Sequence, residues 1–225
     1  MIDTLVNLFS NVDWYEIWIA TGDTLVMLGI SLAFTVLLGL PLGVLMFLTS
    51  PRQLLENQRL YATVALLVNM LRALPFIILL IVMMPLTELI TGTSLGVLGT
   101  LPPLVAGATP FFARLVETAL REVDKGIIEA TQAMGATTRQ IIIKALLPEA
   151  RPGILAAVTV TAIALVSFTA MAGAVGAGGL GDLAIRYGYQ RFQNDVMFVT
   201  VVLLLVLVQI LQTVGDKLVA HFTHR

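Results

Sequence analysis

The sequence predicts an all-α integral membrane protein whose single domain, residues 1–225, crosses the bilayer as five helices. Of its 225 residues, 58% are hydrophobic and only 12% are charged, and the mean hydropathy is +0.95. Soluble domains carry about 25% charged residues. Long intervals without charge recur along the chain, and about 20 apolar residues in a helix are enough to cross the hydrocarbon core of a bilayer.

These intervals place the five spans. The first is Thr24–Pro51, which contains 28 uncharged residues. It follows residues 1–23, where tryptophans mixed with acidic residues predict a helix lying at the membrane surface. Within the first span, Gly39 and Gly43 form the G-x-x-x-G spacing that permits close helix packing. The other spans are expected near residues 60–86, 97–120, 152–181 and 196–215.

Basic residues predict the orientation, because Lys and Arg collect in cytoplasmic loops. Nine of the 13 basic residues fall on one side of the five-span arrangement, and only Arg186 and Arg191 fall on the other, with Arg72 and Arg114 inside spans. We therefore expect the N-terminus outside and the C-terminus in the cytoplasm. The nine residues are Arg52, Arg59, Arg121, Lys125, Arg139, Lys144, Arg151, Lys217 and Arg225.

Two spans contain charged residues. Arg72 lies about 12 residues into the second span, which is roughly 18 Å of helix. A charge at that depth marks a functional candidate, although an arginine paired with a carbonyl or carboxylate, or a helix that enters the bilayer later, fits as well. Pro75 is expected to kink or interrupt this helix. In the third span, Glu117 and Arg121 have the spacing of an i,i+4 ion pair.

The longest stretch that cannot lie in lipid is Glu129–Pro148, between the third and fourth spans. We call residues 122–150 the docking loop. Gly135 is suited to end one helix in the left-handed conformation, and Thr137 with Gln140 fits a capping box that begins another. The second helix is expected to stop at Pro148. Residues at helical spacing predict an apolar face: Ile127, Ala130, Met134, Ile141, Ile142, Ala145 and Leu146.

The docking loop resembles the signature cytoplasmic loop of ABC-importer permeases, which reads Glu-Ala-Ala, three residues, Gly, nine residues, Ile, any residue, Leu-Pro. Thr131 stands in place of the second Ala and Ala145 in place of the Ile, and both are small. In the family this loop is the coupling helix, which fits a groove on a separate ATPase subunit. The matching positions are Glu129, Ala130, Gly135, Leu147 and Pro148.

The resemblance extends over most of the chain. Residues 72–85, 107–120 and 173–192 are similar to the permease subunits of bacterial methionine importers. This likeness implies the type I importer fold, a homodimer in the bacterial inner membrane, and import of L- and D-methionine by alternating access. It also implies two ATP-binding subunits on the cytoplasmic side, which hold ATP and Mg²⁺, and an extracytoplasmic methionine-binding protein. The permease itself is then surrounded by lipid and binds no cofactor.

Two motifs suggest enzymes and are rejected. Residues 92–96 read G-x-S-x-G, the nucleophile-elbow pattern. Ser94 falls in an outer loop, whereas both histidines and the loop lysines are expected inside, so the serine lacks a base. Residues 176–181 read G-x-G-x-x-G, which binds nucleotides only between a strand and a helix. Here it follows an apolar span and predicts a sharp bend or a close backbone approach.

Composition excludes further classes. With no cysteine the chain has no thiol nucleophile, disulfide framework or cysteine-ligated metal, and a net charge of −1 gives no indication of nucleic-acid binding. No G-x-x-x-x-G-K-[ST] phosphate loop occurs, so ATP hydrolysis is expected in another chain and this one is not expected to be an enzyme.

Three residues are candidates for the transport pathway: Arg72, Met171 and Gly173. Met171 precedes the glycine-rich turn and could line a gate, although a methionine in a span is commonly packing. Two other functions are considered. The same architecture could import another small solute, since no residue dictates methionine. A channel or secondary transporter is disfavoured, because acidic residues for ion coupling are missing from the span interiors apart from Glu88 and Glu117 near span ends.

Overall fold

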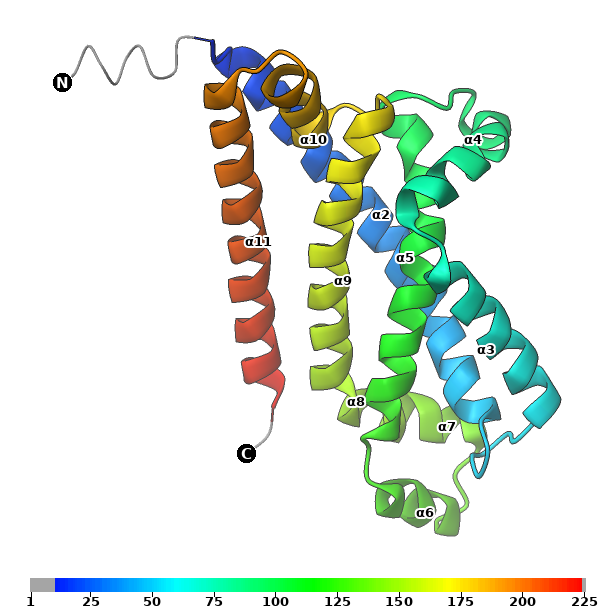
Figure 1. Ribbon diagram of the computed structural model, residues 1–225. Helices are drawn as coiled ribbons and strands as arrows, with labels where there is room; N and C mark the ends of the chain where they lie inside the picture. Colours follow the sequence, from blue (N-terminus) through cyan, green and yellow to red (C-terminus); the bar gives the residue numbers. More distant parts are fainter. Residues whose placement is uncertain (1–10, 224–225) are drawn as a thin grey trace. The chain divides into compact units, whose positions relative to one another are not determined.

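The computed structural model describes residues 11–223, and the regular structure in this part of the chain is all helical, without a strand. Figure 1 shows the helices and their labels. The elements are α2 (Trp14–Thr49), α3 (Gln58–Ala73), α4 (Phe76–Thr91), α5 (Gly96–Arg121), α6 (Lys125–Ala133), α7 (Thr138–Ile141), η1 (Ile142–Leu146), α8 (Leu147–Glu149), α9 (Arg151–Ala172), η2 (Gly173–Val175), α10 (Gly179–Leu183), η3 (Ala184–Tyr189) and α11 (Asn194–Phe222).

Among the described residues, four helices are long and apolar enough to cross a membrane: α2, α5, α9 and α11. The pair α3 and α4 passes the same test as one broken span, which brings the number to five. The prediction of an all-α membrane protein with five spans agrees with this count. For α5, the predicted limits Val97–Leu120 differ from the observed Gly96–Arg121 by one residue at each end.

The N-terminal part differs from the prediction. A surface helix was expected before a first span that begins at Thr24, but α2 runs without interruption from Trp14 to Thr49. Asp23 does not end the helix, and Pro41 lies inside it. Continuing the helix past Asp23 keeps the backbone hydrogen bonds of the residues on both sides satisfied within the helix. The expectation for residues 1–10 lies outside the described residues.

The second span is interrupted at Pro75, as predicted. Helix α3 ends at Ala73, and Leu74 and Pro75 are not helical before α4 begins at Phe76. Proline disfavours the helical conformation of the residue before it and lacks the amide that would continue the hydrogen-bond ladder. Arg72 therefore lies in the last turn of a helix, and not in the interior of a continuous one.

Contacts divide the described chain into two compact units. Unit 1 comprises residues 11–34, 74–107 and 162–211, and unit 2 comprises residues 35–73, 108–161 and 212–223. Each unit has its own apolar core. In unit 1, the core joins the first turns of α2 to α10 and to the start of α11, through residues such as Ile17, Leu180 and Val196.

The core of unit 2 joins α2, α5 and the docking loop. Phe47 of α2 and Phe112 of α5 are buried in it. The predicted G-x-x-x-G packing is confirmed, because a Cβ atom placed on Gly43 would lie 2.6 Å from the carbonyl oxygen of Ala113. A side chain at Gly43 would therefore separate α2 from α5, and glycine permits the contact.

Candidate functional site

The docking loop begins with a capped helix. Asp124 precedes α6, and its carboxylate accepts a hydrogen bond of 2.7 Å from the backbone amide of Gly126. This is the usual role of an N-cap aspartate, which supplies an acceptor to one of the free amides of the first turn. The sequence reasoning had not identified this cap, although Asp124 followed by an apolar periodic stretch is a recognisable start signal.

A Schellman motif with Gly135 as its left-handed residue follows the end of helix α6. The amide of Ala136 donates to the carbonyl of Thr131, and the amide of Gly135 donates to that of Gln132. These are the two bonds that define the motif, with the glycine in the left-handed region. Gly135 has a φ of +77°, so the predicted helix break at this residue is confirmed.

The predicted capping box that begins the second short helix is also present. The backbone amide of Gln140 donates to the Thr137 hydroxyl, and the Gln140 side chain accepts from the Thr137 amide at 2.8 Å. Four residues, Gly135 to Thr138, thus close one helix and open the next. Because both ends are fixed by hydrogen bonds, the turn holds a defined geometry between the helices.

Pro148 does not end the second helix, contrary to the prediction. The chain continues from α7 through the π-helical turn η1 into α8, which contains Pro148, and reaches Glu149. In η1 the amide of Leu147 donates to the carbonyl of Ile142, five residues back. This wider turn removes the requirement for a hydrogen bond from residue 148, so a residue without an amide is accommodated.

One face of the docking loop is anchored in the core of unit 2. Ile128, Ile141 and Leu146 are buried there with Val116 and Leu120 of α5. Figure 1 shows α6 beyond the end of α5. The loop is therefore packed as part of unit 2, and displacement of α6 or α7 would disturb the core around α5.

The other face of the docking loop is exposed, and it includes apolar residues. Met134 is 77% exposed and Ile143 is 52% exposed. The predicted apolar face is thus divided: Ile141 and Leu146 are buried, whereas Ala130 and Met134 are exposed. Exposed apolar residues beside charged ones are typical of a surface that contacts another protein.

The motif residues of the loop fall on both faces. Glu129, Ala130 and Gly135 are exposed, whereas Leu147 and Pro148 are half-buried. Thr131, which departs from the family motif, donates its hydroxyl to the carbonyls of Ile127 and Ile128 at 2.8 and 2.9 Å. The hydroxyl is thus satisfied inside its own helix, and threonine replaces alanine there without an unpaired polar group.

In the last turns of α5, before the docking loop, Glu117 and Arg121 form the predicted ion pair. The distance between an Arg121 terminal nitrogen and a Glu117 carboxylate oxygen is 2.6 Å. Three further residues join it. Arg114 lies 2.5 Å from the other Glu117 oxygen, Tyr61 donates to the carboxylate at 3.1 Å, and Asn69 accepts from Arg114 at 3.2 Å. The spacing of Arg114 and Glu117 could have revealed the first of these contacts, but nothing local indicates Tyr61 or Asn69.

The glycine-rich segment in unit 1 makes the close approach that the sequence predicted. A Cβ atom on Gly173 would collide with backbone atoms of Gly181 and Asp182, and one on Gly181 would collide with backbone atoms of Ala170. Gly176, Gly178 and Gly179 have φ values of +83°, +80° and +78°. The chain thus turns between α9 and α10 through conformations that disfavour other residues.

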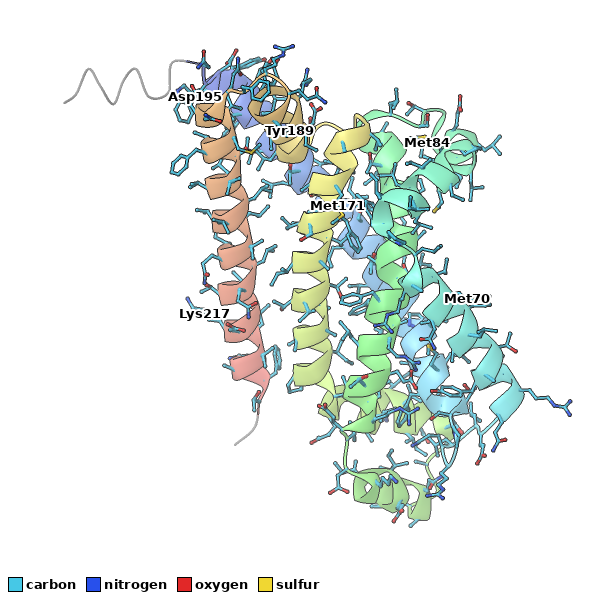
Figure 2. The ribbon with its side chains drawn as sticks, in the orientation of Figure 1. Met70, Met84, Met171, Tyr189, Asp195 and Lys217 are labelled. Carbon is cyan, nitrogen blue, oxygen red and sulfur yellow. The ribbon has the colours of Figure 1, made fainter. Side chains whose placement is uncertain are left out.

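The remaining pathway candidates lie at helix ends. Met171 is in the last turn of α9 and is 48% exposed, and Figure 2 shows its side chain near the end of that helix. Gly173 is buried beside it. Arg72 is exposed, with its guanidinium carbon 5.9 Å from the centre of the Phe111 ring. An aromatic face at this distance stabilises a cation without a carboxylate.

Unit 1 also has a groove of about 210 Å³ between the start of α2 and α10. Its walls include Glu16, Asp23, Asp182 and Arg186, and the last two form an ion pair of 2.7 Å. Near this end, Asp195 of α11 accepts hydrogen bonds from Asn11, and Figure 2 places Asp195 and Tyr189 there.

The two enzyme-like motifs lack the structural context that their chemistry needs. Ser94 lies between α4 and α5, whereas a nucleophile elbow joins a strand to a helix. Residues 176–181 follow a 3₁₀ turn and enter α10, whereas the dinucleotide fingerprint follows a strand. Within residues 11–223, neither motif is in the setting of a catalytic or nucleotide site.

The described residues thus combine apolar helices sufficient for five spans with a capped loop that has one exposed face. Residues 36–225 match the family described as the binding-protein-dependent transport system inner membrane component. The chain belongs to this family.

Curated relatives and solved structures agree with this family. A Vibrio cholerae serotype O1 protein, named as a probable D-methionine transport system permease protein (MetI), is 52% identical over 206 residues, 92% of each chain. A Bacillus subtilis protein, named as a methionine import system permease protein (MetP), is 51% identical over 208 residues, 92% of this chain and 94% of the relative. An inward-facing structure of the MetNI methionine ABC transporter superposes with a TM-score of 0.92 at 47% identity, covering 94% of this chain and 98% of that one.

Proposed function

We propose that this chain is the membrane permease subunit of an ATP-driven methionine importer. The observation that carries the proposal is the similarity to a chain of a methionine ABC transporter over nearly the full length, with a TM-score of 0.92 at 47% identity. The relatives named for methionine and D-methionine transport point in the same direction.

In this proposal, the docking loop contacts the ATPase subunit. The exposed face of α6, with Glu129, Ala130 and Met134, would enter a groove on that partner. The Schellman motif at Gly135 and the capping box at Thr137 support a stiff loop, which a lever requires. ATP and Mg²⁺ are bound by the ATPase, since this chain has no phosphate loop.

Transport proceeds by alternating access. ATP closes the two ATPase subunits, their movement displaces the docking loops, and the spans change from inward-open to outward-open. Leu147 and Pro148 lie on a helical path from the loop to α9. This path is interrupted at one residue, Ala150. The path supports transmission of the displacement into the span.

The assembly in this proposal contains two copies of the chain, two ATPase subunits and an extracytoplasmic methionine-binding protein. In the apolar 18-residue segment of helix α11, only 11% is buried within one copy of the chain, compared with 44% in the corresponding segment of α5. Such a helix needs lipid or another subunit around it. The N-terminus is placed outside, so that the docking loop and the C-terminus face the cytoplasm.

The pathway in this proposal is lined by Arg72, Met171 and Gly173. The broken helix next to Arg72 supports this placement, because non-helical backbone at membrane depth occurs where protein or a water-filled path surrounds it. Met171 is half-exposed beside a turn with no space for larger residues. Its flexible thioether side chain suits an apolar gate.

Uptake of labelled L-methionine tests the substrate. Cells that lack their own high-affinity uptake would express this chain with its ATPase and binding protein, and unlabelled competitors would be added one at a time. Saturable uptake inhibited by L- and D-methionine and not by other amino acids is expected. Uptake of another solute with none of methionine would keep the architecture and overturn the substrate.

A further inference from the structure

Glu117 is a buried carboxylate that neither the docking loop nor the pathway explains. It is 1% exposed and lies in the last turns of α5, a membrane-spanning helix. An ionised group in such a place is costly and is retained only when it is paired. Arg114 and Arg121 pair with it from the same helix, so its charge is already balanced within α5.

A second helix nevertheless joins this group. The Tyr61 hydroxyl of α3 donates to Glu117 at 3.1 Å and lies 3.4 Å from a terminal nitrogen of Arg114. Asn69, two turns further along α3, accepts from Arg114 at 3.2 Å. We call these five residues the charge cluster: Tyr61, Asn69, Arg114, Glu117 and Arg121.

The charge cluster connects α3 to α5 by directional contacts. The apolar contacts of α3 are made with α2, where Met46 is buried against Ala65 and Val68. Between membrane helices, apolar surfaces gain little free energy from burial, because lipid is as apolar as the partner helix. Hydrogen bonds to a charged group fix both distance and direction. Tyr61 and Asn69 therefore help to fix the register of α3 along α5, together with the contact of Arg72 with Phe111.

The position of the charge cluster relates it to the docking loop. Arg121 is the last residue of α5, and α6 begins at Lys125. On its other side α5 presents Val116 and Leu120 to the core that buries Ile128 and Leu146 of the loop. Displacement of the loop thus reaches α5 through an apolar core, and it can reach α3 from α5 through the charge cluster.

We infer that the charge cluster is a tether that makes α3 follow α5 when the docking loop moves, with Tyr61 and Glu117 as positioning residues for coupling. This inference rests on the proposed function, since it assigns a role within ATP-driven transport. Because α3 leads directly to the broken segment at Pro75, the tether carries the movement of the docking loop to the helix that precedes the break.

Tyr61→Phe is the sharpest test, because it removes one hydroxyl and leaves the ring and all three charges in place. Replacing Glu117 would instead leave two arginines uncompensated and endanger folding. In proteoliposomes with the complete transporter, Tyr61→Phe is expected to import at least about fivefold fewer methionine molecules per ATP hydrolysed. Thr63→Ala is the matched control, since the Thr63 hydroxyl is exposed and bonds only to the carbonyl of Arg59 in its own helix.

A distance measurement separates a tether from a local packing role. The chain has no cysteine, so spin labels can be attached at Ala62→Cys on α3 and Thr118→Cys on α5, both exposed positions. Complexes with one labelled protomer would be measured with and without ATP. The distance is expected to stay constant in the parent chain and to broaden or shift with ATP in Tyr61→Phe.

Each outcome decides the inference. Tyr61→Phe with an unchanged ratio of methionine to ATP overturns it, and so does a lower ratio with an unchanged label distance. If the parent transporter imports no methionine, the proposed substrate fails, while the label distances with and without ATP still decide whether α3 follows α5.

Discussion

At the scale of single residues, backbone conformation and space explain most of the positions that matter. Gly135 has a left-handed backbone conformation, and a Cβ atom added there would have no neighbour within 4 Å. Gly173 lies in a 3₁₀ turn, and a Cβ atom added there would collide with backbone atoms. The two glycines are thus required for different reasons. This difference predicts different responses to substitution.

Gly135→Val is expected to reduce uptake several-fold, and Gly135→Asn is expected to retain it. A left-handed conformation costs an ordinary L residue about 1–2 kcal/mol, and asparagine tolerates it better than β-branched residues. Uptake by membrane vesicles, with the amount of inserted protein measured in parallel, checks the prediction. Equal loss in both variants would show that the loop requires space at residue 135, and not the left-handed backbone.

Gly173→Ala is expected to destabilise the protein by about 1–3 kcal/mol or more, because the new methyl group meets backbone atoms that cannot move aside. Thermal unfolding of the detergent-solubilised chain measures the effect. Gly22→Ala is the control, since this glycine is in the interior of α2 and has open space around it. A Gly173→Ala variant as stable as Gly22→Ala would contradict the close contact of α9 with α10.

At the scale of elements, features set by neighbouring residues could be predicted from the sequence. The break at Gly135, the capping box at Thr137 and the limits of α5 depend on local propensities and charges. Pro148 was mispredicted, since a π-helical turn relieves the proline and no local signal announces that turn. Tyr61 was missed because it meets Glu117 across 56 positions of sequence, and only the packing of α3 on α5 brings them together.

The apolar face predicted for the docking loop includes Met134, which is exposed in the structure. Helical spacing selected Met134, but the helix ends before this residue, at Ala133. Periodicity applies only inside a helix, so a residue beyond its last turn leaves the apolar face. Exposure of Met134 is the consequence, and it supplies an apolar contact for the proposed ATPase partner.

The orientation of the elements gives an independent prediction. Single cysteines at two exposed positions, Met134→Cys in the docking loop and Tyr189→Cys after α10, are expected to react from opposite sides of the membrane. A membrane-impermeant thiol reagent added to intact cells should label Tyr189→Cys only. Labelling of Met134→Cys under these conditions would reverse the orientation deduced from the basic residues.

At the scale of the whole molecule, the proposed importer needs separate polypeptides for ATP hydrolysis and for substrate capture. The family consists of inner membrane components of transport systems that depend on a binding protein, and the chain itself has no phosphate loop. A channel or an ion-coupled carrier would move solute without ATP. Dependence on ATP therefore separates the proposed importer from both alternatives.

The most direct measurement is accumulation of labelled methionine in proteoliposomes that contain this chain and its ATPase, with and without ATP and the binding protein. Accumulation against a gradient is expected only when the ATPase, ATP and the binding protein are all present. Methionine movement that continues without ATP, or ATP hydrolysis that never drives methionine accumulation, would contradict it.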